Sequence, residues 1–163
     1  MRLSFKIKHY FFSAFREFFV HHHNSLEFRA KLFALLIAAD EKSSLQSCLI
    51  VKNIGMDIYK NDEDRSNLLM LSTKELVQKV KDNNGLDIDT LITNIQKEVR
   101  IIPRYAKKIN IENLQQLLNL TTDVDVLAYQ ENIIEFLQTL KDDTLQNKKQ
   151  QIAKDEENLE SKY

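Results

Sequence analysis

The longest apolar run of the chain, Leu26 to Ala39 (LEFRAKLFALLIAA), constrains the fold more than any other feature. Asn24 can cap a helix there, and Glu27 follows at capping-box spacing. Residues 32–39 contain no polar side chain, and a helix that is apolar all round has to be covered on every side. The segment is much shorter than a membrane span, which needs about 20 residues. It therefore predicts the central helix of a soluble bundle.

The composition predicts a single all-α domain. One Pro and two Gly in 163 residues leave too few turn-forming residues for an all-β fold. A net charge of −1 lacks the basic character of a nucleic-acid-binding protein. The single cysteine excludes an internal disulfide and favours a reducing compartment. We therefore expect a cytoplasmic protein whose partners do not include nucleic acid.

The segment 4–22 predicts a first helix, and its place inside or at the edge of the bundle is left open. Five phenylalanines recur on one face, which indicates either packing on the central helix or a partner-binding surface: Phe11, Phe12, Phe15, Phe18 and Phe19. A basic amphipathic helix at a membrane interface is a third interpretation, although membrane contact is not expected. Charged residues interrupt the apolar positions, so the segment does not read as a signal peptide.

The side chains of His21, His22 and His23 would point about 100° apart on a helix, which argues against a metal site.

Caps, stops and apolar periodicity predict the remaining helices. The predicted segments are 44–54 with Gly55 as its stop, 62–71, 72–82 with a Ser72/Glu75 capping box, a helix capped by Asp87 or Asp89, a helix capped by Asn110 that carries the apolar positions from Ile111 to Leu120, and 126–141. Pro103 predicts a bend or a new start. Cys48 is expected as a buried thiol on the apolar face that also carries Leu49. Residues 142–163 are almost entirely polar and predict a frayed or disordered tail. The expected architecture is a bundle of seven or eight helices over residues 1–141, followed by that tail.

A weak internal repeat supports a bundle built from two similar hairpins. Leu32–Ile54 aligns without a gap to Gln115–Leu137, and both copies read as apolar helix, acidic turn, apolar helix. The motif at 35–40 (LLIAAD) and its fainter copy at 120–123 (LTTD), with Glu131 eight residues on, resemble the TerB-like helical domains of tellurite-resistance proteins. Related domains stand at the N-terminus of some J-domain co-chaperones. The resemblance would cover about residues 18–140.

The resemblance implies a divalent-cation site at the two acidic turns. Its ligands would come from one set of carboxylates: Asp40, Glu41, Asp123, Asp125 and Glu131. This chain departs from the family pattern, because Glu41 stands where the family has Gly and Cys48 where the equivalent of Glu131 is expected. The other interpretation of these acids is that they are helix caps and solvated turn residues.

The sequence contains none of the motifs that would indicate an enzyme. No phosphate-binding loop, nucleophile elbow, H-E-x-x-H or paired C-x-x-C is present, so we expect no catalysis and no cofactor. The leading hypothesis is a non-catalytic protein–protein interaction module, a bacterial cytosolic adaptor or co-chaperone, for example in secretion or flagellar export, that offers a helical groove. The alternative is a metal-binding, TerB-like stress-response protein that uses the Asp40 and Asp123 turns.

Overall fold

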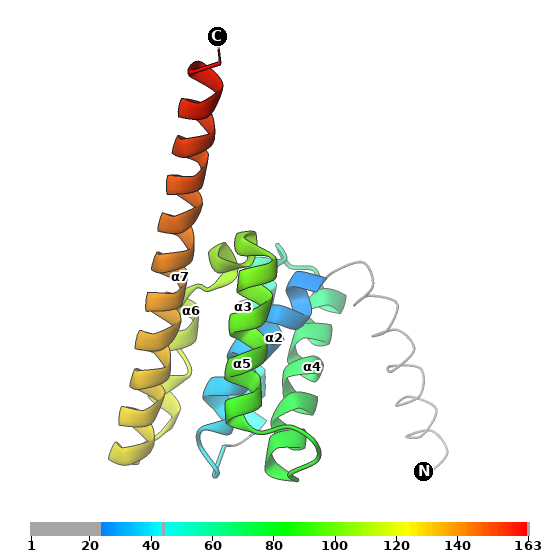
Figure 1. The fold of residues 1–163 in the computed structure, drawn as a ribbon. Coiled ribbons are helices and arrows are strands. Elements are labelled where there is room, and N and C mark those ends of the chain that lie inside the picture. Colours follow the sequence, from blue (N-terminus) through cyan, green and yellow to red (C-terminus); the bar gives the residue numbers. More distant parts are fainter. Residues whose placement is uncertain (1–23, 44, 163) are drawn as a thin grey trace.

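The computed structural model describes residues 24–43 and 45–162, and every regular element in these ranges is helical (Figure 1). The elements are the α-helices α2 (Asn24–Ala38), α3 (Leu45–Ile58), α4 (Glu63–Lys81), α5 (Ile88–Ile101), α6 (Ile111–Gln115) and α7 (Val124–Glu160), with the 3-10 helices η1 (Pro103–Lys108) and η2 (Leu118–Leu120). The predicted all-α class is confirmed. The predicted helix 4–22, its phenylalanines and the three histidines lie outside the described residues, so the total number of helices stays a prediction.

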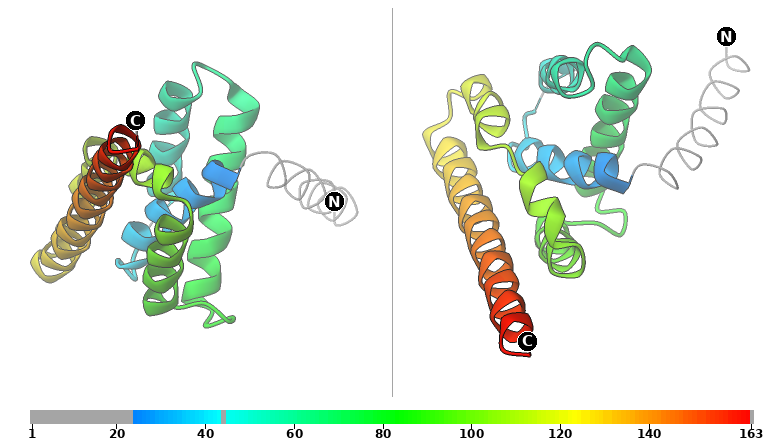
Figure 2. Two further views of the ribbon diagram at one scale, coloured as in Figure 1. Left: turned by 45° about the horizontal axis from the view of Figure 1, so that its top comes forward. Right: turned by 90° about the horizontal axis from the view of Figure 1, so that it is seen from above.

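Helix α2 is the centre of the bundle, as its apolar run predicts. Leu26, Phe28, Ala30 and all residues from 32 to 38 are buried, and Leu35 and Ile37 are only 0% and 3% exposed. Figure 2 shows α2 lying between the α3–α4 pair and α5. Phe28 stacks on Tyr105 of η1 with ring centroids 5.0 Å apart. The core therefore forms around α2 because its neighbours cover it from several directions.

Helices α3 and α4 pack closely at Gly55, where the sequence-based boundary is wrong. We expected Gly55 to end the helix, but α3 continues to Ile58 and Gly55 is buried. A Cβ atom added there would lie 3.1 Å from the Cα of Ser66 and 3.3 Å from Cδ2 of Leu69. Gly55 therefore allows α3 and α4 to approach each other closely, and it does not end a helix. Leu49, predicted on the buried face with Cys48, is 51% exposed.

Helix α4 is continuous through the predicted capping box. Asp62 caps its start by accepting a hydrogen bond from the backbone N–H of Arg65, with an oxygen–nitrogen distance of 3.1 Å. Ser72 lies inside the helix and is buried, so the prediction of a second helix starting there is wrong. The Ser72 and Glu75 spacing fits a cap, but nothing interrupts the helical hydrogen bonding before Asp82.

The predicted caps further along the chain are confirmed. Asp87 accepts from the backbone N–H of Thr90 at 2.7 Å and Asn110 from that of Asn113 at 3.1 Å, and Pro103 opens η1. The helix after Asn110 is shorter than predicted, because α6 ends at Gln115 and the next turn is the 3-10 helix η2. Part of the proposed second repeat is therefore 3-10 where the first copy is α-helical, and the internal repeat is not confirmed.

Helix α7 begins at Val124 and runs to Glu160 as a single helix. Its first half packs on the bundle through Ile133, Ile134 and Leu137. Its second half covers the segment that we predicted as a frayed or disordered tail, and every residue from 146 to 162 is exposed. In Figure 1 this half projects beyond the other helices. Among the described residues, no helix combines the length and apolarity needed to cross a membrane.

Candidate functional site

The carboxylates of the metal hypothesis make local backbone hydrogen bonds. Oδ1 of Asp123 caps α7 by accepting from the backbone N–H of Asp125 at 3.0 Å, and Oδ1 of Asp40 accepts from that of Lys42 at 2.9 Å. Glu41, Asp125 and Glu131 are exposed. In the described part of the chain, no three His, Cys, Asp or Glu side chains gather in a way that could hold a metal ion. The geometry supports the interpretation of Asp40 and Asp123 as turn and cap residues.

The Cys48 thiol is buried, as predicted. Burial raises its pKa, and the positive charges of Lys74 and Lys81 offset only part of this effect. A thiol whose pKa is raised is mostly protonated at neutral pH, and the protonated form is a poor nucleophile. Cys48 is therefore a core residue and not a candidate for covalent chemistry.

An open groove of about 420 Å³ lies between α5, η1 and the middle of α7, and we call it the α5–α7 groove. Its apolar lining residues are the buried Val99, the half-buried Leu140 and the exposed Pro103. Six polar residues complete its lining: Gln96, Arg100, Thr144, Asn147, Lys148 and Gln151. Ile101, which follows Arg100 at the end of α5, is 66% exposed. The groove thus offers apolar contact area flanked by hydrogen-bond donors and acceptors.

A second, smaller hollow of about 80 Å³ lies at the junction of α2, α3, η1 and α6, and we call it the Arg29 hollow. Its lining combines cationic, amide and apolar side chains: Arg29, Leu32, Phe33, Ile58, Lys107, Lys108, Asn110, Asn113 and Leu114. Leu32, Phe33 and Leu114 are buried core residues, so they form its floor. The three cations come from α2 and η1, which are far apart in sequence.

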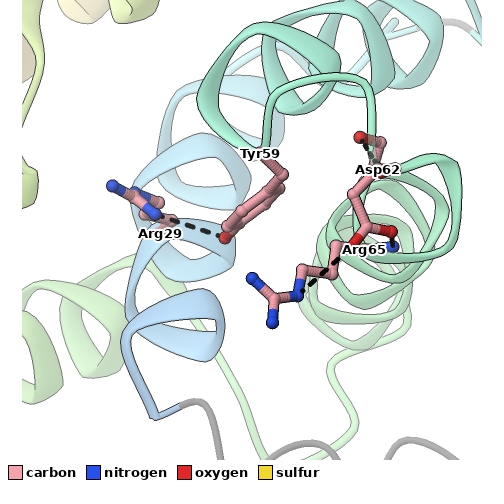
Figure 3. Close-up of polar contacts among 5 residues, drawn as sticks. Arg29, Tyr59, Asp62 and Arg65 are labelled. Carbon is pink, nitrogen blue, oxygen red and sulfur yellow. Dashed lines mark hydrogen bonds and ion pairs between the residues drawn. The ribbon is translucent and has the colours of Figure 1, made fainter.

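Tyr59 holds the guanidinium group of Arg29 in place (Figure 3). Nη1 of Arg29 donates to the Tyr59 hydroxyl at 3.3 Å, and the guanidinium carbon lies 5.5 Å from the ring centroid, within cation–π range. The guanidinium carbon of Arg65 lies 6.0 Å from the same ring, and Nε of Arg65 pairs with Asp62 at 3.4 Å. One tyrosine thus orients a cation at the edge of the Arg29 hollow.

The Arg29 hollow carries positive charge that no carboxylate of the described residues pairs. Burial lowers the pKa of Lys108, and the neighbouring Arg29 and Arg104 lower it further. Glu98 of α5 pairs with Lys31 at 3.0 Å. Within residues 24–43 and 45–162, no ion pair joins a carboxylate to Arg29, Arg104, Lys107 or Lys108. The local field therefore favours an anion.

Comparisons with protein-family models, with curated proteins and with solved structures found no match for this chain. The resemblance to TerB-like domains consequently stays a prediction.

Neither the α5–α7 groove nor the Arg29 hollow was predicted from the sequence. The segment 100–108 (RIIPRYAKK) contains four basic residues and no acidic one, and this local excess was a usable signal for the cationic rim. No comparable signal pointed to Arg29, because its role depends on Tyr59 and on the packing of α2 against η1. The apolar lining of the α5–α7 groove is likewise assembled from helices that are distant in sequence.

Proposed function

We propose that this protein is a non-catalytic protein-interaction module, a cytosolic adaptor or co-chaperone that binds a helical segment of a partner protein in the α5–α7 groove. The observation that carries the proposal is the groove itself, whose lining combines the apolar Val99, Pro103 and Leu140 with polar side chains. Recognition of an amphipathic helix uses this combination, because apolar anchors enter the groove and polar groups fix the register.

The dimensions of the groove agree with this role. A volume of about 420 Å³ has room for a few side chains and lies within the range typical of ligand-binding clefts. Arg100 and Lys148 add positive charge at its rim, which favours a partner helix with acidic residues beside its apolar anchors.

The phenylalanines at 11, 12, 15, 18 and 19 remain a second candidate surface for the same function. Pull-down with the intact protein and with Phe12→Asp and Phe15→Asp tests their part separately. If the variants retain the same partner, the aromatic face is not the binding surface.

Site-specific photo-crosslinking tests the groove directly. A crosslinking residue placed at Asn147, in the groove, should capture a defined partner protein in the native cell. The same residue at Asn84, an exposed position in the turn after α4, is the matched control. The partner should crosslink from position 147 and not from position 84, and bulky substitution of Gln96 by Trp should abolish the product. Equal capture at both positions, or capture that Gln96→Trp leaves unchanged, would contradict the proposal.

A further inference from the structure

The Arg29 hollow combines a cationic rim with an apolar floor, and the two parts face the same small space. Arg29, Lys107 and Lys108 supply the charge, and the floor is aliphatic and aromatic. The carboxamide oxygen of Asn110 is engaged in capping the backbone N–H of Asn113 at 3.1 Å, so its NH₂ group is left as a donor. The rim therefore presents donors almost exclusively.

The rim is organised before any ligand arrives. The Tyr59 hydroxyl accepts one of the five N–H groups of Arg29, and the tyrosine ring lies beside the guanidinium plane, so the remaining donors keep a restricted orientation. Lys108 lines the same hollow. Burial lowers the pKa of its ammonium group, and the positive charges of Arg29 and Arg104 lower it further. An anion in the hollow would relieve this repulsion.

The size and the floor select the kind of anion. A volume of about 80 Å³ is far below that of a nucleotide or drug-sized pocket, which takes roughly 300–1,000 Å³. A phosphate dianion would have to place oxygens against Leu32, Phe33 and Leu114, where they could not be hydrogen-bonded. A carboxylate on a short aliphatic stem avoids this cost, because the stem covers the floor while the two oxygens meet the rim.

We propose that the Arg29 hollow is a binding site for a carboxylate carried on a short aliphatic stem, distinct from the α5–α7 groove. The carboxylate can belong to a small free acid or to a glutamate side chain presented by a peptide. Arg29 and Lys108 contribute charge-assisted hydrogen bonds, and Asn110 contributes a neutral one.

Titration of the full-length, ¹⁵N-labelled protein with 4-methylpentanoate tests the site. The amide signals of Asn113 and Leu114 should shift in a saturable manner. The neutral analogue 4-methylpentanamide has the same stem, and it should bind at least about tenfold more weakly because charge-assisted hydrogen bonds are lost. Equal binding of acid and amide, a preference for inorganic phosphate, or no saturable shift would overturn the proposal.

Matched variants separate the site from general electrostatics. Lys108→Gln should weaken binding by at least about fivefold, in line with the loss of one such hydrogen bond. Lys154→Gln removes the same charge from the exposed end of α7 and should leave the affinity within about twofold, since the charge lies in solvent far from the hollow. Equal weakening by both would overturn the proposal.

An N-acetylated, amidated peptide with one internal Glu between leucines distinguishes the two possible sources of the carboxylate. Tighter binding than the free acid supports a peptide ligand at this site, and weaker binding supports a small acid.

Discussion

Gln130 joins α7 to the central helix. Its Nε2 donates to the carbonyl oxygen of Leu36 at 3.0 Å, and both residues are buried. Leu36 is among the last four residues of α2, whose carbonyls lack partners within the helix. The hydrogen bond from Gln130 gives one of these carbonyls a partner that lies 94 positions away in the sequence. Nothing local in the sequence distinguishes Gln130 from the exposed Gln146, Gln150 and Gln151 of the same helix, so its role could not be predicted.

Replacing Gln130 with Met keeps the shape of the side chain and removes the donor. We expect the free energy of unfolding to fall by about 1 kcal/mol, because the Leu36 carbonyl is left buried without its partner, while removal of the buried, unpaired Oε1 of Gln130 offsets part of this loss. Urea denaturation of the two proteins measures the difference. Asn132→Ala, at an exposed position of the same helix, is the control and should change stability by less than about 0.5 kcal/mol. Equal effects of the two substitutions would contradict this account.

Asp87 gives the start of α5 a pH dependence. Hydrogen bonds from the backbone and side chain of Thr90 lower the pKa of the Asp87 carboxyl below its ordinary value of 3.8. Because the folded-state pKa is lower than the unfolded one, the carboxylate stabilises the folded protein above pH 3.8, and this contribution is lost as the pH falls through the lowered pKa. Asp87→Asn keeps an acceptor but does not titrate. Its stability should therefore decline less steeply than that of the wild type in urea titrations below about pH 4; parallel declines would refute the assignment.

Among the helices, the sequence predicted the starts more accurately than the ends. Asp87 and Asn110 cap helices as predicted, since a cap depends on contacts within one turn. Gly55 did not end a helix because it allows close packing of α3 on α4, and Ser72 did not start one because it lies buried inside α4. Both lie in the bundle, Gly55 against Ser66 of α4, and that contact is made between helices. Sequence periodicity identifies which face is buried, but it does not show how closely two faces approach.

Gly55→Ala tests the close approach of α3 and α4. Alanine gains about 1 kcal/mol over glycine in helix propensity. The new methyl group would stand 3.1 Å from a backbone atom of Ser66, and such overpacking costs about 1–3 kcal/mol. We expect a net loss of about 1 kcal/mol in urea denaturation. Asn53→Ala, at an exposed position of α3, gives the propensity effect alone. If Gly55→Ala stabilised the protein as the control does, the helices would not be in the described contact.

At the scale of the whole molecule, the sequence predicted the centre and missed the surface sites. The central helix was predictable because residues 32–38 are apolar on every side, and all of them are buried. The two hollows were not, since each is lined by elements that come together only in the fold, such as Arg29 of α2 with Lys108 of η1. The binding sites that we propose could not be predicted from the sequence for the same reason, because they depend on surfaces that form only in the folded protein.

Helix α2 is enclosed by the other helices, whereas the end of α7 lies in solvent. Native-state amide hydrogen exchange measures both in one experiment. Amides at 30–37 should exchange only through global unfolding, because no local opening exposes them, and amides at 147–160 should exchange through fraying at a much lower free energy. Fast exchange in α2, or protection at 147–160 equal to that of α2, would contradict the account.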